Sequence, residues 1–404
     1  MTRFIQRRVV VAAFASVMAL QPLTGIAQTL PREAAFARDP AAAAPQPPEV
    51  AARVFLLWDL SSQQMLATRQ ADQPVDPAAL TRLMTAYLVL QAVAQGKLDL
   101  QQEVPVSPRA WQAAVTSGGR PLVAAGGRVK VGDLLKAMAV VGAGDAALAL
   151  AETVGGGADQ FVDMMNRQAQ VLGLKSTRFR NPDGHKASGQ TSSARDLAWL
   201  AIRLLNDFPG AQPLYAAREF VWGGVRQPSL NLLLLRDPSV DGLQTSYAEG
   251  GGYGMIATSR VKTPAGERRL LSVVLGAASP DARATESQKL LNWGYSAFDA
   301  VKLYEAGQPV SQVPVWKGSS STVPVGWAQP LVVAVPHGQA AQIKTVLVRN
   351  DPLMAPLRKG QVVATLNVSL AGQPWQAVPL QALETVSPAG WLGQAWDAFR
   401  LGIK

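Results

Sequence analysis

The stretch from Val75 to Tyr87, VDPAALTRLMTAY, most constrains the fold because it combines a helix start with a continuous apolar face. Asp76 is a residue type that caps helix N-termini, and Pro77 suits the first helical position. The apolar residues that follow recur at helical spacing, at Leu80, Leu83, Met84, Tyr87 and Leu88. The sequence therefore predicts a buried helix here, around which the other elements are arranged.

Residues 1–27 have the three parts of a secretory signal peptide. A basic start is followed by an apolar run from Val9 to Leu20 and by the small-residue site Gly25-Ile26-Ala27. The run is too short for a membrane span, which needs about 20 residues, and no later segment reaches that length. We therefore expect export, with cleavage after Ala27.

The chain has no cysteine, so its cores depend on packing, and thiol catalysis and metal thiolate sites are excluded. Its formal net charge is +10, of which the arginines at 3, 7 and 8 contribute three, so the exported chain carries about +7 (10 minus 3). A positive charge suits an anionic cell wall or lipid surface. Aromatic and basic residues do not interleave as in proteins that stack single strands, so we expect no nucleic-acid partner.

The order of patterns along the chain predicts separate domains. An Ala- and Pro-rich leader at 28–50 precedes residues 51–308, where strand patterns at both ends enclose helical patterns. This arrangement predicts one α/β (α+β) domain whose terminal strands share a sheet. Beyond it, alternation of the kind at Val362–Leu370 replaces the helical patterns and predicts a small all-β domain at 309–385.

Residues 386–404 return to helical spacing. Their large apolar residues fall on one stripe at steps of four, three and four: Leu392, Trp396, Phe399 and Ile403. Tryptophans and terminal cations on such a helix are typical of a helix that lies in a bilayer surface. A helix docked on the β domain would have the same pattern, and the pattern alone does not choose between the two.

The stretch from Val75 to Tyr87 resembles the D-alanyl-D-alanine carboxypeptidases of the low-molecular-mass, penicillin-binding protein 5 type, whose matching segment reads Asp-Pro-Ala-Ser-Leu-Thr-Lys-Met-Met-Thr. Similar stretches are SVDGL from Ser239, ESQKLLNWG from Glu286 and APLRKGQVV from Ala355. The resemblance covers residues 51 to 404. It implies a β-lactamase/transpeptidase-like domain, a β domain behind it and a membrane-associating C-terminal helix. It also implies cofactor-free removal of the terminal D-alanine from peptidoglycan stem peptides.

The family's first motif is Ser-x-x-Lys, which places a nucleophile and a base on one helix face. The matching positions in this chain are Ala79 and Arg82. Alanine has no atom to acylate, and a guanidinium, with a pKa above about 12, takes no proton from a nucleophile. In another serine hydrolase, loss of the nucleophile costs about a millionfold in turnover. We expect neither function to remain.

The other motifs have changed as well. Ser-x-Asn relays protons and positions the substrate, and its positions are Gly142 and Gly144. Of Lys-Thr-Gly, only the threonine remains in the sequence Gln244, Thr245, Ser246. An arginine that the resemblance implies beside the substrate carboxylate is replaced by Leu230, whereas the following Asn231 is kept. These losses all fall in one expected cleft.

No other residue is an evident substitute. Thr85, one turn past Arg82, has no base beside it. His185 follows a turn that contains Asp183 and suggests a Ser-His-Asp arrangement, but closeness in sequence does not assemble one. The chain has only two histidines and no cysteine, which does not support a transition-metal site.

We therefore expect an exported, inactive family member that is peripheral to the periplasmic face of the inner membrane and binds or scaffolds in peptidoglycan metabolism. Its partner is a stem peptide or a cell-wall enzyme, and Arg82, Asn231 and Thr245 are the candidate cleft contacts. One alternative is an active serine-type carboxypeptidase. Another is an interaction module that uses the β domain and C-terminal helix alone. The sequence does not indicate an oligomeric state.

Overall fold

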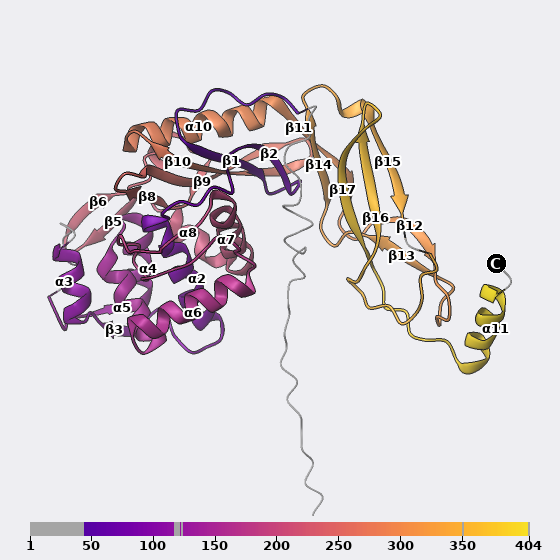
Figure 1. The fold of residues 1–404 in the computed structure, drawn as a ribbon, viewed down its shortest axis with the longest axis horizontal. Helices are drawn as coiled ribbons and strands as arrows, with labels where there is room; N and C mark the ends of the chain where they lie inside the picture. Colours follow the sequence, from indigo (N-terminus) through magenta and orange to yellow (C-terminus); the bar gives the residue numbers. More distant parts are fainter. Residues whose placement is uncertain (1–43, 117–121, 123, 350, 403–404) are drawn as a thin grey trace, which may run out of the picture.

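The structure is a computed structural model that describes residues 44–116, 122, 124–349 and 351–402. Figure 1 shows a larger body of helices and sheet joined to a smaller body of strands, with the last helix at the far end of the smaller body. The signal peptide that we predict at 1–27, and residues 28–43 of the leader, lie outside the described residues.

The sheet of the larger body contains strands from both ends of that domain. Its order is β2-β1-β10-β9-β7, and β8 also pairs with β9. The strands are β1 (Val54–Asp59), β2 (Gln64–Arg69), β7 (Val240–Gly242), β8 (Thr245–Ala248), β9 (Gly252–Thr263) and β10 (Gly266–Ala277). Because β1 pairs antiparallel with both β2 and β10, the prediction that the terminal strands share a sheet is confirmed.

Helices cover both faces of this sheet (Figure 1). One face carries α10 (Pro280–Ala297). The other carries the main helical layer of α2 (Arg82–Ala94), α4 (Val131–Val140), α5 (Gly144–Gly155), α6 (Ala158–Val171) and α7 (Ala194–Asp207). Shorter elements complete the body: α3 (Pro108–Thr116), α8 (Gln212–Tyr215), α9 (Leu233–Arg236), η2 (Pro209–Ala211), β3 (Glu103–Pro105), β4 (Arg128–Lys130), β5 (Glu219–Trp222) and β6 (Val225–Pro228).

The helix α2 is buried on nearly all sides, and every residue from Leu83 to Leu90 is buried. A helix that is apolar all round belongs in a core, so the prediction of a buried helix is confirmed. Its start differs from the prediction, because Ala78–Thr81 form a 3₁₀ helix, η1, and α2 begins only at Arg82. The Asp76 carboxylate accepts the Ala78 N–H at 2.9 Å in the turn that leads into η1, so Asp76 is not the N-cap of α2.

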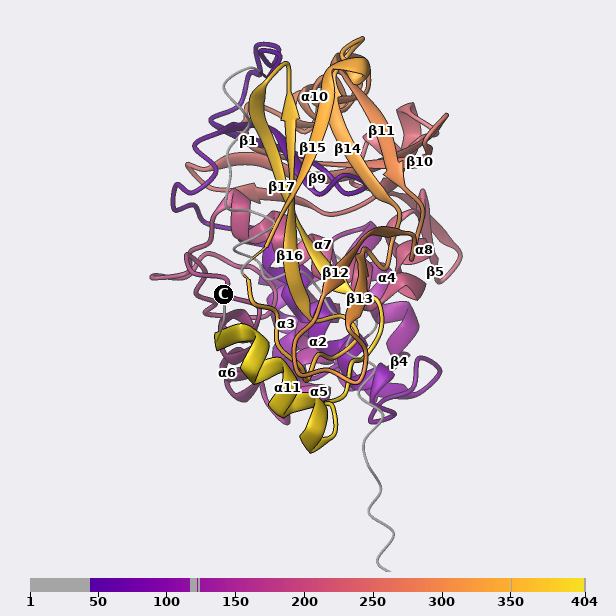
Figure 2. The same cartoon turned by 90° about the vertical axis from the view of Figure 1, so that its right-hand side faces the viewer.

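The smaller body is all β apart from a 3₁₀ turn, η3 (Ala340–Gln342) (Figure 2). A sheet of order β12-β13-β17-β16-β15 accompanies a β11-β14 pair. The strands are β11 (Phe298–Tyr304), β12 (Pro309–Pro314), β13 (Thr322–Gly326), β14 (Leu331–Pro336), β15 (Ile343–Val348), β16 (Val362–Leu370) and β17 (Gln373–Ala382). The predicted class, a mixed domain followed by a β-rich one, is confirmed. The pair β11-β14 joins segments on either side of residue 308, where we place the domain boundary.

The two bodies meet at the turn between β1 and β2. The side chain of Gln64 donates from Nε2 to Ala334 O at 3.2 Å and accepts the Ala334 N–H on Oε1 at 2.6 Å. Gln376 of β17 donates from Nε2 to Ser62 O at 3.2 Å. Buried apolar residues of both bodies also form one continuous cluster. The bodies are therefore docked by polar and apolar contacts.

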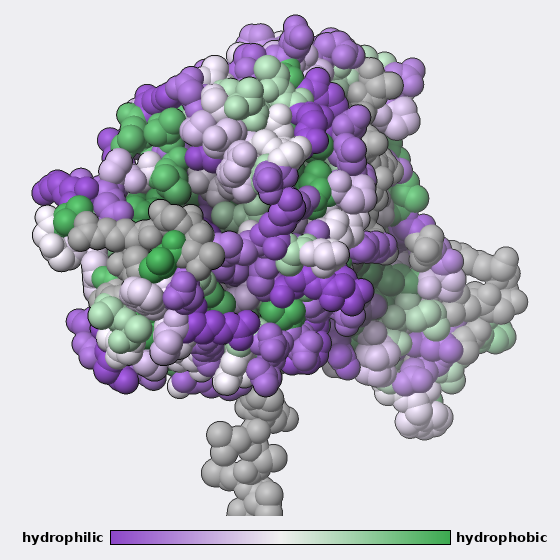
Figure 3. Space-filling view, turned by 60° about the vertical axis from the view of Figure 1, so that its left-hand side comes forward, coloured by the Kyte–Doolittle hydropathy of each residue, from purple (hydrophilic) through white to green (hydrophobic). Residues whose placement is uncertain are grey.

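The last helix, α11 (Trp391–Gly402), leaves its large apolar side chains exposed: Trp391 by 78%, Leu392 by 64%, Trp396 by 62% and Phe399 by 62%. Elsewhere, on the face drawn in Figure 3, hydrophilic residues cover most of the surface and apolar residues form small patches. Ile403, the last residue of the predicted stripe, lies outside the described residues. Within the described part of the chain, we find no helix that combines the length and the apolar character of a membrane span.

Candidate active site

The motif positions come together around η1 and the start of α2. The strand β8 lies against η1 from one side. From another side, the turn that ends at Gly184 lies directly on η1, because a Cβ at Gly184 would be 2.1 Å from Ala78 O and 2.9 Å from the Cα of Ala79. Arg82 then reaches the loop before α5. The fold thus brings these motif positions together around η1.

Arg82 connects α2 to two facing loops. Its Nε donates to Asp183 O at 2.7 Å, and its Nη1 donates to Gly142 O at 2.5 Å. Burial lowers the pKa of Arg82, and the negative charges of Asp183 and Asp145 oppose that shift. The guanidinium therefore acts as a donor that holds the walls of the cleft together.

The two glycines of the second motif leave room that Arg82 and Leu230 occupy. Gly142 has a φ of +66°, and a Cβ there would lie 3.1 Å from both Arg82 Nη1 and Leu230 Cδ1. Gly144 begins α5, and a Cβ there would lie 3.6 Å from Arg82 Nη2. A side chain at position 142 would thus be crowded and would sit in a backbone conformation that favours glycine.

The third motif lies along the start of β8. Gln244, Thr245 and Ser246 are all buried. Ser246 pairs with Gly254 of β9, where a Cβ would come within 2.5 Å of the serine Oγ. Arg283 of α10 donates to Ser246 O at 2.8 Å. The strand keeps its place in the sheet, but Gln244 has an amide where the family motif has a lysine.

Leu230 and Asn231 differ in exposure. The Leu230 side chain is 48% exposed, and its backbone N–H donates to Val140 O at 3.0 Å. Asn231 is 2% exposed, and its Oδ1 accepts the Leu233 N–H at 3.1 Å. Among the described residues, Asn231 Nδ2 has no hydrogen-bond partner. The asparagine therefore shapes its own buried turn, and the leucine is what this segment presents outward.

Asp183 and His185 form a hydrogen-bonded pair beside Arg82. The bond joins His185 Nδ1 to Asp183 Oδ2, with the imidazole 43% exposed and the carboxylate 5% exposed. This hydrogen bond raises the pKa of His185. Burial alone would raise the pKa of Asp183, but the bond and charge of His185, together with Arg82, lower it overall. Across the described side chains, no hydroxyl bonds to the imidazole, so a Ser-His-Asp triad is not formed.

Thr85 of α2 contacts the same turn. It is fully buried, and its Oγ1 donates to Pro182 O at 2.6 Å, so its hydroxyl is used in holding the turn against α2. Within the described chain, no three His, Asp or Glu side chains gather as a metal site would require. The hydrogen bonds from Arg82 and Thr85 to this turn could not be predicted from the sequence, because the bonded residues lie about a hundred positions apart.

Comparisons with known proteins agree over nearly the whole described chain. A family profile described as D-alanyl-D-alanine carboxypeptidase matches residues 41–279, and one described as the penicillin-binding protein 5 C-terminal domain matches residues 298–388. The chain is 37% identical over 355 residues to D-alanyl-D-alanine carboxypeptidase DacC of Escherichia coli K12, covering 87% of this chain and 88% of that protein. It is 33% identical over 360 residues to DacA of Haemophilus influenzae, covering 89% and 91%.

Solved structures give the same result. Penicillin binding protein 5 from Haemophilus influenzae superposes with a TM-score of 0.77 at 33% identity, over 85% of this chain and 99% of that one. Penicillin binding protein 6B from Escherichia coli superposes with a TM-score of 0.68 at 32% identity, over 84% and 98%.

Proposed function

Because the chain belongs to the D-alanyl-D-alanine carboxypeptidase family of the penicillin-binding protein 5 type, we propose that it is an inactive member with a binding or scaffolding role in peptidoglycan metabolism. The observation that carries the proposal is the pair at the nucleophile and base positions. Ala79 has no nucleophilic atom, and both hydrogen bonds of Arg82 to the cleft walls are donated.

Acyl transfer needs a nucleophile, a base that takes its proton, and groups that pass a proton to the leaving amine. The first two are absent at Ala79 and Arg82. The third is absent at Gly142 and Gly144, which have no side chains. The Asp183–His185 pair supplies a base near the cleft but has no hydroxyl to act on among its described contacts.

The packing around Gly142 supports the loss of the Ser-x-Asn motif. A serine at this position would meet Arg82 and Leu230 at 3.1 Å and would adopt a positive φ. Such a residue costs about 1 kcal/mol or more in backbone strain. Arg82, Leu230 and Gly142 therefore fit one another, so these three departures from the family pattern are compatible in one packing arrangement.

Arg82 is also the group through which a ligand can still be held. Its Nη1 and Nε donate to the Gly142 and Asp183 carbonyls, and its Nη2 is the nitrogen nearest Gly144. A carboxylate is the ligand that a guanidinium best recognises, and Thr245 lies on the adjacent strand edge. We infer a partner that is either a stem peptide with a terminal carboxylate or a cell-wall enzyme.

The proposed place of action is the periplasmic face of the inner membrane. The predicted signal peptide supports export. The exposed aromatic residues of α11 support contact with a bilayer surface, since a helix docked on the β domain would bury them. The positive charge of the exported chain suits anionic lipid as well as the anionic wall.

Labelling with a fluorescent penicillin tests the loss of catalysis. We expect no covalent band on the unaltered chain, because acylation needs an oxygen at position 79. An active carboxypeptidase of the family, labelled in parallel, shows that the reagent works. The Ala79→Ser, Arg82→Lys double variant shows whether restoring the nucleophile and base is sufficient for acylation.

A penicillin band on the unaltered chain would overturn the proposal and leave an active serine-type carboxypeptidase in its place. Isothermal titration with a D-Ala-D-Ala peptide then tests the ligand separately. Heat that disappears in Arg82→Met supports the stem peptide as partner. The absence of heat at millimolar peptide would exclude the stem peptide as the partner and favour a cell-wall enzyme.

A further inference from the structure

A large cavity lies between the two bodies, away from the cleft. Its volume is about 1460 Å³, and none of the motif positions lines it. Its walls come from the turn between β1 and β2, the turn between β9 and β10, the end of α7, and the strands β12, β13, β14 and β17. Ligand sites occur preferentially at such junctions between domains.

Half of the serine, amide and charged side chains that line this cavity are amides. Its charged residues balance, since Glu267 and Glu384 are matched by Lys302 and Lys359. An amide both donates and accepts hydrogen bonds, and so do the hydroxyl and acetamido groups of sugars. The amides are Gln63, Asn206, Gln312, Gln329, Gln376 and Gln381.

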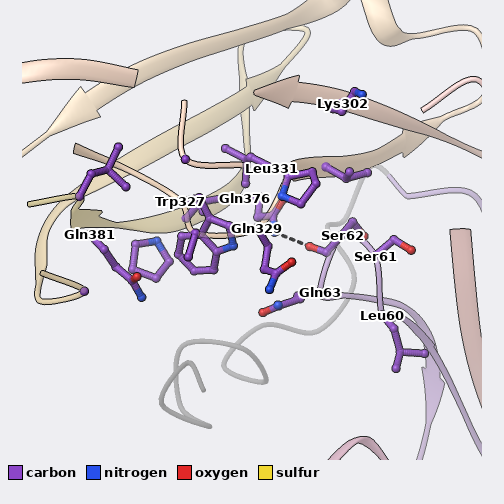
Figure 4. Close-up of a pocket in the computed structure, with 18 of the residues that line it drawn as sticks. Leu60, Ser61, Ser62, Gln63, Lys302, Trp327, Gln329, Leu331, Gln376 and Gln381 are labelled. Atoms are coloured by element: carbon purple, nitrogen blue, oxygen red, sulfur yellow. Dashed lines mark hydrogen bonds between the residues drawn. The ribbon is translucent and has the colours of Figure 1, made fainter. Parts of the chain in front are cut away.

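An aromatic ring lies among these amides. Figure 4 shows the indole of Trp327 beside Gln329 and Gln376, facing the turn that carries Ser62 and Gln63. An aromatic side chain offers a flat apolar face together with a polar edge. Trp327 is only 9% exposed, so it contributes a small apolar part of the wall beside the amides.

Two of the lining residues have buried polar atoms without a hydrogen-bond partner among the described residues. Ser62 is 4% exposed, and its Oγ has no hydrogen-bond partner among the described residues. The same holds for Oε1 of Gln376, whose Nε2 is held by Ser62 O. Buried polar groups are normally satisfied. These two atoms therefore retain hydrogen-bonding capacity in residues that line the cavity.

Other ligand classes fit this lining less well. A phosphate or carboxylate ligand needs an excess of cations, and here the charges balance. A lipid tail needs a continuous apolar wall, and six amide side chains interrupt the apolar residues of this one. The volume also exceeds the range of about 300–1,000 Å³ that is usual for a single small molecule, which favours several linked rings.

We propose that this interdomain cavity binds a neutral oligosaccharide segment that carries hydroxyl and acetamido groups. The site is separate from the degenerate cleft and does not depend on whether the cleft binds a peptide. Because its walls belong to both bodies, the sugar also ties the β domain to the larger body.

Isothermal titration of the full chain with chitotetraose, a neutral chain of N-acetylated sugar rings, tests the site. We expect saturable binding that the double variant Gln312→Ala, Gln329→Ala weakens by about tenfold, because two amide contacts are removed. Both glutamines are exposed, so the variant should fold. The matched control is Gln373→Ala, an exposed glutamine of the same domain that lies outside the cavity.

The proposal is overturned if the unaltered chain shows no saturable heat with chitotetraose at millimolar concentration. Equal affinities of the double variant and the unaltered chain would also overturn it, since binding would then lie elsewhere. A D-Ala-D-Ala peptide added in excess should leave the sugar affinity unchanged. Displacement of the sugar by the peptide would place it in the cleft and contradict the separate site.

Discussion

A single residue, Arg82, changes both the chemistry and the mechanics of the cleft. A lysine at this position would be a flexible ammonium that can lose its proton when buried. The guanidinium instead has a planar set of donors, and it fixes Gly142 O and Asp183 O at once. The change therefore exchanges a base for a cross-link between α2 and two loops.

The sequence was sufficient to find which residues stand at the motif positions, because each motif has a fixed spacing. What these residues contact could not. The sequence suggested Asp183 and His185 as a pair, and they do bond to each other, but the hydroxyl of a triad is missing. Arg82 and Thr85 lie on one helix face by spacing, yet their partners come from a turn a hundred residues away.

The Asp183–His185 pair predicts how stability changes with pH. The folded pKa of His185 is raised, so its contribution is complete below the unfolded value of about 6.5 and is lost as pH rises through the folded pKa. The folded pKa of Asp183 is lowered, so its contribution is present above about pH 4 and is lost as pH falls through the folded value. The pair stabilises most between these limits.

We therefore expect His185→Gln to lower the free energy of unfolding more at pH 5.5 than at pH 9, by up to about 1 kcal/mol, because solvent screens the half-exposed imidazole. Urea denaturation at the two pH values measures the difference. His337→Gln is the control, since that side chain is 75% exposed in its pair with Asp299. The same loss at both pH values for His185→Gln would contradict the argument.

At the level of elements, the long segment with periodic apolar residues was predictable. The 3₁₀ turn before α2 was not. Apolar spacing located α2 because the residues at that spacing are buried in the core. The 3₁₀ turn η1 depends on tertiary contact, since Gly184 presses on Ala78 and Ala79. No local pattern carries that information.

The helix α11 predicts membrane binding that depends on its aromatic face. Trp396 and Phe399 are both 62% exposed, whereas Asp397 Oδ2 accepts the Lys317 N–H at 2.7 Å and holds the helix to the β domain. Inserting an aromatic side chain into a bilayer surface is favourable by roughly 1.5–3 kcal/mol. We expect Trp396→Gln with Phe399→Gln to reduce co-sedimentation with anionic phospholipid vesicles at least about tenfold.

Gln394→Ala is the matched control for that experiment, because it changes an exposed polar residue of the same helix and should leave vesicle binding unchanged. Circular dichroism of each variant checks that the fold is retained. Undiminished binding by the aromatic double variant would favour a helix whose partner is a protein.

At the level of the whole molecule, the sequence indicated two domains but not how they dock. The pairing that joins them is between side chain and backbone, over 270 residues, and leaves no periodic signal. The Gln64 side chain hydrogen-bonds to both the N–H and the carbonyl of Ala334, as the backbone of a neighbouring strand would. The Ala334 carbonyl also accepts the indole N–H of Trp375 at 2.8 Å. One amide at the start of β2 thus makes two of the polar contacts that dock the bodies.

Gln64→Ala should loosen this junction without unfolding either body. The Ala334 N–H loses its acceptor in a buried position, which costs about 1–3 kcal/mol, whereas its carbonyl keeps the bond from Trp375. We expect faster amide hydrogen exchange in the peptide that contains β14, with little change in α5 or α6. Gln73→Ala is the control, since that side chain is exposed in a turn of the larger body. Equal exchange of β14 in the two variants would show that the apolar cluster alone docks the domains, and faster exchange in Gln64→Ala alone would show that the cavity's walls are held in register by this amide.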